Sequence, residues 1–184
     1  MAAESNMMPL GTEAPDFNLK DVISGKMVSL SDVRREYGLV VMFICAHCPY
    51  VQNIEEEIAV VARQYMGQKI GFVAISSNDA ETYPEDAPEG LKEQADEYDF
   101  RFPYLYDESQ EVAKAYNAAC TPEFYLFDED LKCIYRGRFD SSTPKNNEPV
   151  SGDELIAAME KHLEDEPPLK TQKPSIGCSI KWKG

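Results

Sequence analysis

The residues from Leu39 to Val51 form the feature that most constrains the fold of this chain. They begin with six consecutive apolar residues, which are typical of a strand buried on both faces. Two cysteines three positions apart follow, and apolar residues then recur every three or four positions, as on one face of an amphipathic helix. That stripe consists of Val51, Ile54, Ile58, Val61 and Tyr65. The sequence therefore predicts a cysteine pair where a buried strand turns into a helix.

The position of Cys45 and Cys48 at the start of a helix suggests that they are reactive thiols. The first N–H groups of a helix lack intrahelical partners, and the helix dipole adds partial positive charge there. A thiol at that position is stabilised as a thiolate, the form that attacks disulfides and peroxides. We interpret Cys45 as a solvent-reachable attacking thiol and Cys48, one turn later, as the resolving thiol. His47 lies between them and favours the thiolate through its own partial charge.

Composition excludes several classes of protein. A chain of 184 residues is long enough for one well-buried domain. Its formal net charge of −15 argues against nucleic acid or an anionic membrane as a partner. No apolar run is long enough for a membrane span, and residues 1–15 lack the basic start and apolar core of a secretory signal. We therefore expect a cytoplasmic protein, in which a cysteine pair indicates redox or metal chemistry.

The chain divides into three parts. Residues 1–14 are expected to be a loose leader, residues 15–166 a single redox domain, and residues 167–184 a basic tail. The tail has four lysines and no acidic residue, so we expect it to dock on the acidic domain with Trp182 as an apolar anchor. The acidic run at 76–90 is interpreted as a solvated loop.

Within the domain, apolar periodicity and turn residues predict the following elements. Strands are expected at 16–20, 26–30, 39–44, 70–75, 104–106, 123–127 and 133–138. A short helical turn is expected at 31–33, and helices at 51–66, 91–98 and 109–116. A last helix is expected to begin with a capping box formed by Ser151 and Glu154.

This order of elements, together with four motifs, resembles the thioredoxin-fold redoxins of the peroxiredoxin-like group, which includes alkyl hydroperoxide reductases and thiol-specific antioxidant proteins. The motifs are Gly-Thr-Glu-Ala-Pro-Asp-Phe at 11–17, Phe-Ile-Cys-Ala-His-Cys-Pro-Tyr-Val at 43–51, Cys-Thr-Pro-Glu-Phe at 120–124 and Pro-Ser-Ile-Gly-Cys at 174–178. The resemblance covers nearly the whole chain. It implies an α/β fold with a central mixed sheet flanked by helices.

The resemblance also implies roles near the cysteine pair. Pro122 is expected to follow a cis peptide bond and face the pair, with Thr121 offering backbone hydrogen bonds to a bound peptide. Cys120 and Cys178 are possible third thiols. Cys133, in an alternating strand, is interpreted as a buried small hydrophobe.

Three functions remain open on the sequence alone. The first is a thiol–disulfide oxidoreductase that acts on protein or small-molecule disulfides and exchanges electrons with a second thiol system. The second is a thiol peroxidase with Cys48 peroxidatic and Cys45 resolving, although Val41 and Cys45 stand where peroxiredoxins have Pro and Thr. The third is a protein that handles Cu(I) or zinc through Cys45, His47 and Cys48. A structural zinc site usually needs two ligand pairs and this chain has one, so we assign no metal site and no cofactor.

Overall fold

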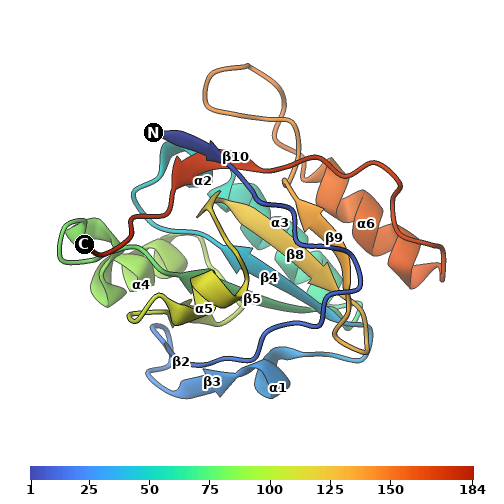
Figure 1. Ribbon diagram of the computed structural model, residues 1–184, viewed down its shortest axis with the longest axis horizontal. Coiled ribbons are helices and arrows are strands. Elements are labelled where there is room, and N and C mark those ends of the chain that lie inside the picture. Colours follow the sequence, from blue (N-terminus) through green and yellow to red (C-terminus); the bar gives the residue numbers. More distant parts are fainter.

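A seven-stranded mixed sheet forms the centre of the molecule in a computed structural model, which describes all residues from 1 to 184 (Figure 1). The strand order is β3-β2-β6-β5-β4-β8-β9. The strands are β2 (Asn18–Asp21), β3 (Met27–Ser29), β4 (Leu39–Phe43), β5 (Gly71–Ser76), β6 (Tyr104–Tyr106), β8 (Glu123–Phe127) and β9 (Cys133–Gly137).

Strand β4 is the centre of this sheet. It pairs in parallel with β5 and antiparallel with β8, so every residue of β4 has a partner on both sides and is buried. Its unbroken apolar run is suited to a strand that is buried on both faces. The predicted α/β fold with a central mixed sheet is confirmed.

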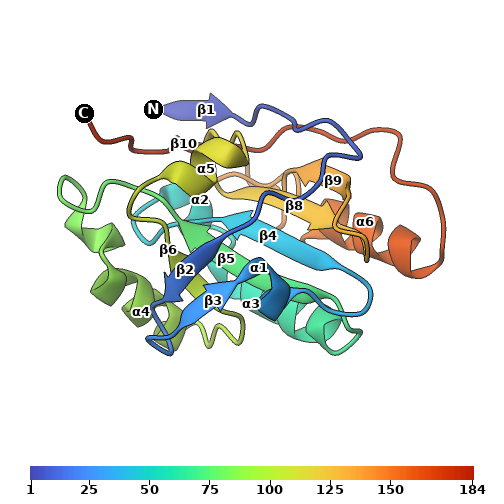
Figure 2. The same cartoon turned by 60° about the horizontal axis from the view of Figure 1, so that its bottom comes forward.

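Helices cover the two faces of the sheet, and alternate residues of β4 point into two separate cores (Figures 1 and 2). One core holds Val40 and Met42 and includes residues of α3, α4 and α6. The other holds Leu39 and Val41 and includes residues of α1 and α5. The helices are α1 (Leu30–Val33), α2 (Pro49–Gln52), α3 (Glu55–Met66), α4 (Pro88–Glu97), α5 (Glu111–Ala115) and α6 (Asp153–Leu163). No helix is both long and apolar enough to span a bilayer.

Two predicted helix features are wrong in detail. The helix expected to run from 51 to 66 is broken at Asn53 and Ile54, where α2 ends and α3 begins. The capping box expected from Ser151 and Glu154 is absent, because Gly152 is the N-cap residue of α6 and the Ser151 hydroxyl accepts the Asp153 N–H at 3.3 Å. The carboxylate of Asp140 accepts hydrogen bonds from the Ser151 and Gly152 N–H groups there, both at 2.8 Å.

A second, three-stranded sheet joins the two ends of the chain. Its order is β1-β10-β7, all antiparallel, with β1 (Ala2–Glu4), β7 (Cys120–Thr121) and β10 (Ile176–Ser179). Both chain ends lie beside it in Figure 2. The prediction of a loose leader at 1–14 is therefore wrong, because β1 finds a hydrogen-bonding partner in a strand from the opposite end of the chain.

The tail at 167–184 lies along the domain and is held mainly by backbone hydrogen bonds. Ser175 exchanges hydrogen bonds with Ser5, and Ile180 N–H donates to the Ala119 carbonyl at 3.1 Å. Trp182 is not the expected apolar anchor, because it is 44% exposed, whereas the smaller Ile180 is buried at 3%. Backbone hydrogen bonds hold this segment on the domain, and a charge pattern does not reveal such bonds.

Candidate active site

The cysteine pair lies between the end of β4 and the start of α2. Helix α2 begins with Pro49, and Cys48 is its N-cap residue. Pro is favoured at the first helical position because its missing N–H has no partner to lose there. The expectation that Cys45 stands at the helix start is therefore wrong, because Cys48 occupies that place and Cys45 lies three residues before it.

Both sulfurs are covered. Cys45 and Cys48 each have 0% relative exposure, so the predicted solvent-reachable Cys45 is also wrong. Strand β10 supplies part of this cover, since it packs against α2 and its Cys178 side chain contacts Cys48. Contact with either sulfur of the pair thus depends on movement of its cover.

The Thr121–Pro122 segment meets the pair from β7. The peptide bond between these two residues is cis, which confirms the prediction. Cys45 Sγ lies 3.5 Å from Thr121 Oγ1, and Cys48 Sγ lies 3.4 Å from the Thr121 carbonyl oxygen. Thr121 therefore contacts both sulfurs, one through its side chain and the other through its backbone.

Cys48 is the acidic thiol of the pair. The Cys45 thiol, in hydrogen-bond contact with it, lowers the pKa of Cys48 to about 5, against the opposing effect of burial. The Cys178 thiol, Thr121 and the Val51 N–H act in the same direction as Cys45. At neutral pH the negative charge of the pair therefore resides on Cys48.

Cys45 keeps its proton. Its hydrogen bond to Cys48 raises the pKa of Cys45 well above the ordinary value, and burial and the negative charge of Asp86 add to this effect. The ionised thiol is expected at Cys45 from the sequence, and the direction of these shifts favours Cys48 instead. The reduced pair is poised with a thiolate at Cys48 and a protonated donor at Cys45.

Asp86 fixes the loop that carries the pair. It belongs to the short 3-10 turn η1 (Pro84–Asp86) and has no exposed surface. One carboxylate oxygen accepts the Ala46 and His47 N–H groups, at 2.8 and 3.1 Å. The other contacts the His47 ring and accepts from the Asn78 side-chain amide at 2.9 Å.

Sequence reasoning misses Asp86, because the acidic run at 76–90 predicts a solvated loop. Its neighbour Glu85 is indeed exposed, so two adjacent acids in the same run have opposite environments. Asp86 follows Pro84, a residue that favours the first position of a helical turn, and this is the only local sign of an ordered segment. His47 extends the arrangement, since its ring stacks on Tyr83 with centroids 5.1 Å apart.

A buried network supports the same loop from α4. The Gln94 side-chain amide donates to the Cys45 carbonyl at 3.1 Å and to Glu55 at 2.7 Å. Tyr104 donates its hydroxyl to Gln94 at 2.8 Å. Cys45 is therefore held through its backbone as well as its sulfur, and its position is fixed in the reduced protein.

The other three cysteines differ in surroundings. Cys133 is buried at 1%, as predicted. Cys120 is buried with its sulfur directed to the Ser175 carbonyl and the Glu123 carboxylate, and burial followed by the Glu123 charge raises its pKa. Cys178 is half-buried and is the thiol in hydrogen-bond contact with Cys48.

A metal ion would find its ligands at Cys45, His47 and Asp86, whose ligand atoms lie within 4.8 Å of one another. However, both Asp86 oxygens already bind protein donors, and these bonds orient the loop. The carboxylate would have to give up these bonds to bind an ion.

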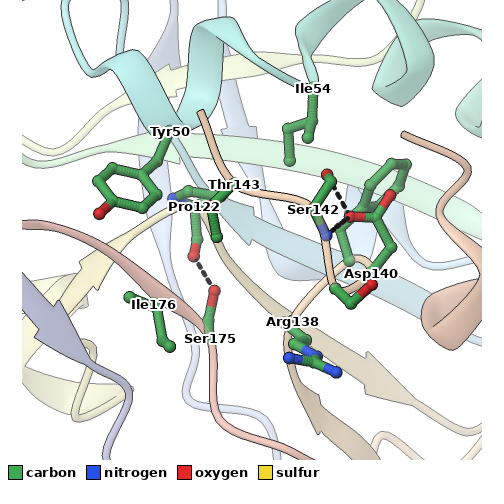
Figure 3. Close-up of a pocket in the computed structure, with 11 residues that line it drawn as sticks. Tyr50, Ile54, Pro122, Arg138, Asp140, Ser142, Thr143, Ser175 and Ile176 are labelled. Atoms are coloured by element: carbon green, nitrogen blue, oxygen red, sulfur yellow. Dashed lines mark hydrogen bonds between the residues drawn. The ribbon is translucent and has the colours of Figure 1, made fainter. Parts of the chain in front are cut away.

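A pocket opens beside Pro122 (Figure 3). Tyr50 and Ile176 line one side of it, and Arg138 and Asp140 the other. The Ser175 hydroxyl donates to the Pro122 carbonyl at its edge. The pocket offers apolar and charged contacts next to the cis Thr121–Pro122 bond.

Residues 10–136 match the AhpC/TSA family. The chain belongs to this family. Its fold is the thioredoxin-like fold of that family, with the small sheet β1-β10-β7 added to it.

Relatives of this AhpC/TSA protein include the thiol-disulfide oxidoreductase ResA of Bacillus cereus. It is 28% identical over 132 residues, which cover 72% of this chain and 71% of ResA. An uncharacterized conserved protein from Geobacillus kaustophilus superposes with a TM-score of 0.98 at 57% identity, over 100% of this chain and 97% of that one. A hypothetical protein from Sinorhizobium meliloti does so with a TM-score of 0.95 at 44% identity, over 98% of each chain.

Proposed function

We propose that this AhpC/TSA protein is a thiol–disulfide oxidoreductase in which Cys48 attacks and Cys45 resolves. The observation that carries the proposal is the place of Cys48 at the N-cap of α2, against Thr121, with Cys45 three residues before it. The directions of the pKa shifts agree with this, since contact between the two thiols lowers the pKa of Cys48 and raises that of Cys45. The name of the distant relative ResA supports the same class of reaction.

The chemistry is a pair of exchanges. The Cys48 thiolate attacks one sulfur of a substrate disulfide, forms a mixed disulfide and releases the other sulfur as a thiolate. Cys45 then loses its proton and attacks Cys48 Sγ, which releases the second substrate thiolate. The substrate disulfide gains two electrons, the two cysteines lose two as they form a disulfide, and the two released thiolates take up the protons that their pKa values require.

His47, backed by Asp86, is the proton acceptor of the second exchange. Cys45 must give up its proton at that moment, and the His47–Asp86 pair lies within 4.8 Å of its sulfur. A ring nitrogen backed by a buried carboxylate is a suitable acceptor for such a proton.

The partners follow from this chemistry. One is a protein or small molecule with a disulfide, and the other is a thiol donor that returns the oxidised pair to its reduced form. The pocket beside Pro122 is suited to hold the first, through Tyr50 and Ile176 on one side and Arg138 on the other.

The test measures reduction of a cystine-containing peptide by the reduced protein. Cys48→Ser is expected to lower the rate by about a thousandfold or more, since it removes the nucleophile. A variant with both Cys45→Ser and Cys178→Ser is expected to accumulate a mixed disulfide between the peptide and Cys48, because it lacks both thiols that contact this sulfur.

Cys133→Ala is the matched control, because Cys133 is a buried cysteine outside the site, and its rate is expected to match that of the unaltered chain. Full activity in Cys48→Ser, or a mixed disulfide that maps to another cysteine, would refute the assignment.

A thiol peroxidase is the second candidate, and the lowered pKa of Cys48 favours it because peroxides also react with thiolates. In that case Cys48 would pass through a sulfenic acid before Cys45 closes the disulfide. The reduced protein would then be oxidised faster by hydrogen peroxide than by the peptide disulfide at equal concentration. The reverse order of rates favours disulfide exchange.

A further inference from the structure

We propose that Cys178 is a third redox-active thiol, which exchanges with the oxidised pair to form a Cys48–Cys178 disulfide. This inference rests on the proposed function, since it takes the Cys45–Cys48 disulfide as its starting point. It assigns a reaction to a residue in the tail, outside the segment that matches the family at 10–136.

Strand β10 places Cys178 by backbone pairing. Cys178 lies opposite Thr121 in the antiparallel register with β7, and opposite Ala2 in the register with β1. Thr121 is the residue whose carbonyl oxygen lies 3.4 Å from Cys48 Sγ. The register therefore places Cys178 opposite the residue that contacts both sulfurs of the pair.

The tail packs directly against the Thr121–Pro122 segment at Gly177, where there is no room for a side chain. A Cβ on Gly177 would lie 1.9 Å from the Thr121 carbonyl oxygen and 3.2 Å from Pro122 Cδ. Ser175, two residues earlier, donates to the Pro122 carbonyl. The cysteine that follows Gly177 is thereby held beside Cys48, on a strand that packs against α2.

Cys120, the other thiol considered from the sequence, is placed differently. Its sulfur is directed to the carbonyl of Ser175 and to the carboxylate of Glu123. It pairs with Ser179 rather than facing α2. Of the two candidates, Cys178 is the one that contacts the pair.

The exchange conserves electrons. The Cys178 thiol loses its proton and its sulfur attacks Cys48 Sγ in the Cys45–Cys48 bond. A Cys48–Cys178 bond forms, the Cys45–Cys48 bond breaks, and Cys45 leaves and takes up a proton. No oxidant or reductant is consumed, because one disulfide is replaced by another.

The pKa of Cys178 is affected differently in the reduced and in the oxidised protein. In the reduced protein, burial and then the Cys48 thiolate beside it raise the pKa of Cys178 to about 11. In the oxidised pair Cys48 carries no charge, so the second of these effects is removed and attack by Cys178 becomes easier. The exchange is therefore restricted to the oxidised state.

The new disulfide would be more accessible than the old one. Cys45 and Cys48 are both at 0% exposure, whereas Cys178 is only half-buried. An external thiol that attacks Cys178 would release Cys48, whose low pKa makes it a good leaving group. Exchange with Cys178 thus replaces a covered disulfide by one that a donor thiol can reach from solvent.

The experiment maps the disulfides of the full-length oxidised protein. The reduced protein is oxidised with a small cyclic disulfide, its free thiols are blocked with N-ethylmaleimide at acidic pH to prevent further exchange, and the peptides are analysed by mass spectrometry without reduction. We expect a Cys48–Cys178 disulfide with blocked Cys45 in more than about one tenth of the oxidised molecules.

The outcomes separate this inference from the proposed function. Cys45–Cys48 with Cys178 fully blocked would overturn the third thiol and leave the proposed function standing. The same holds for a disulfide that joins Cys178 to any residue except Cys48. A protein in which Cys48 enters no disulfide would overturn both.

Three variants sharpen the result. Cys45→Ser removes the competing partner, so Cys48–Cys178 is expected to become the main intramolecular disulfide. Cys178→Ser is expected to leave Cys45–Cys48 alone and to slow its reduction by an external dithiol about tenfold. Cys120→Ala is the matched control, because it removes a buried thiol of the same sheet, and the pattern of disulfides is expected to stay unchanged.

Discussion

Asp86→Ala is expected to lower the free energy of unfolding by about 3 kcal/mol or more, which is large for a residue in a short turn. The carboxylate is fully buried and accepts hydrogen bonds from Ala46, His47 and Asn78. Its removal leaves these donors without a partner in a place that water does not reach. Urea denaturation of the reduced protein measures the change.

Glu85→Ala is the matched control for Asp86→Ala. Glu85 belongs to the same short turn but is exposed, so its substitution is expected to change the free energy of unfolding by less than about 0.5 kcal/mol. A loss in Asp86→Ala no larger than that of the control would show that the carboxylate does not hold the loop of the cysteine pair.

Gly177→Ala is expected to expose Cys48. A Cβ at this position would overlap the Thr121 carbonyl oxygen, which lies 1.9 Å away in the backbone of the neighbouring strand and cannot rotate aside. Strand β10 must therefore move away from β7. We expect alkylation of Cys48 by iodoacetamide at pH 7 to accelerate about tenfold or more, because the thiolate is already formed and access limits its rate.

Gly184→Ala provides the control in the same tail, since nothing lies within 4 Å of a Cβ added there. Its alkylation rate is expected to equal that of the unaltered chain. Peptide mapping identifies which cysteine has reacted. Equal rates in both variants would show that β10 is not the cover of the sulfur.

Sequence patterns predict the parts of the site that local chemistry determines. The apolar run of β4 and the change of period after the cysteines locate the pair at a strand–helix junction. The Thr121–Pro122 motif brings a second segment to the same place, but only through the resemblance to known redoxins, because the contact joins residues more than 70 positions apart.

The first residue of the helix is also predictable, although the hydrophobic stripe leads to the wrong cysteine. Pro49 lacks an N–H and has a fixed backbone angle, so it favours the first position of a helix, with Cys48 as the cap. This preference of proline indicates Cys48, rather than Cys45, as the thiol at the helix start. The stripe does not, because it gives the face of a helix and not its first residue.

The remaining features depend on contacts that no local pattern contains. Asp86 differs from exposed Glu85 only through its distant partners on the cysteine loop. The meeting of Cys178 with Cys48 depends on the register of β10 against β7, which is set by the close approach at Gly177. The sequence indicates Cys178 as a possible third thiol but does not distinguish it from Cys120.

The most direct measurement is a titration of the reduced protein by thiolate absorbance at about 240 nm. We expect one thiolate to form with a midpoint near pH 5, to be absent in Cys48→Ser and to remain in Cys133→Ala. In Cys45→Ala the midpoint should rise, because the hydrogen bond that does most to lower the pKa of Cys48 is lost. A reduced protein without thiolate absorbance below about pH 8, or one that keeps it in Cys48→Ser, would contradict the assignment of Cys48 as the attacking thiol.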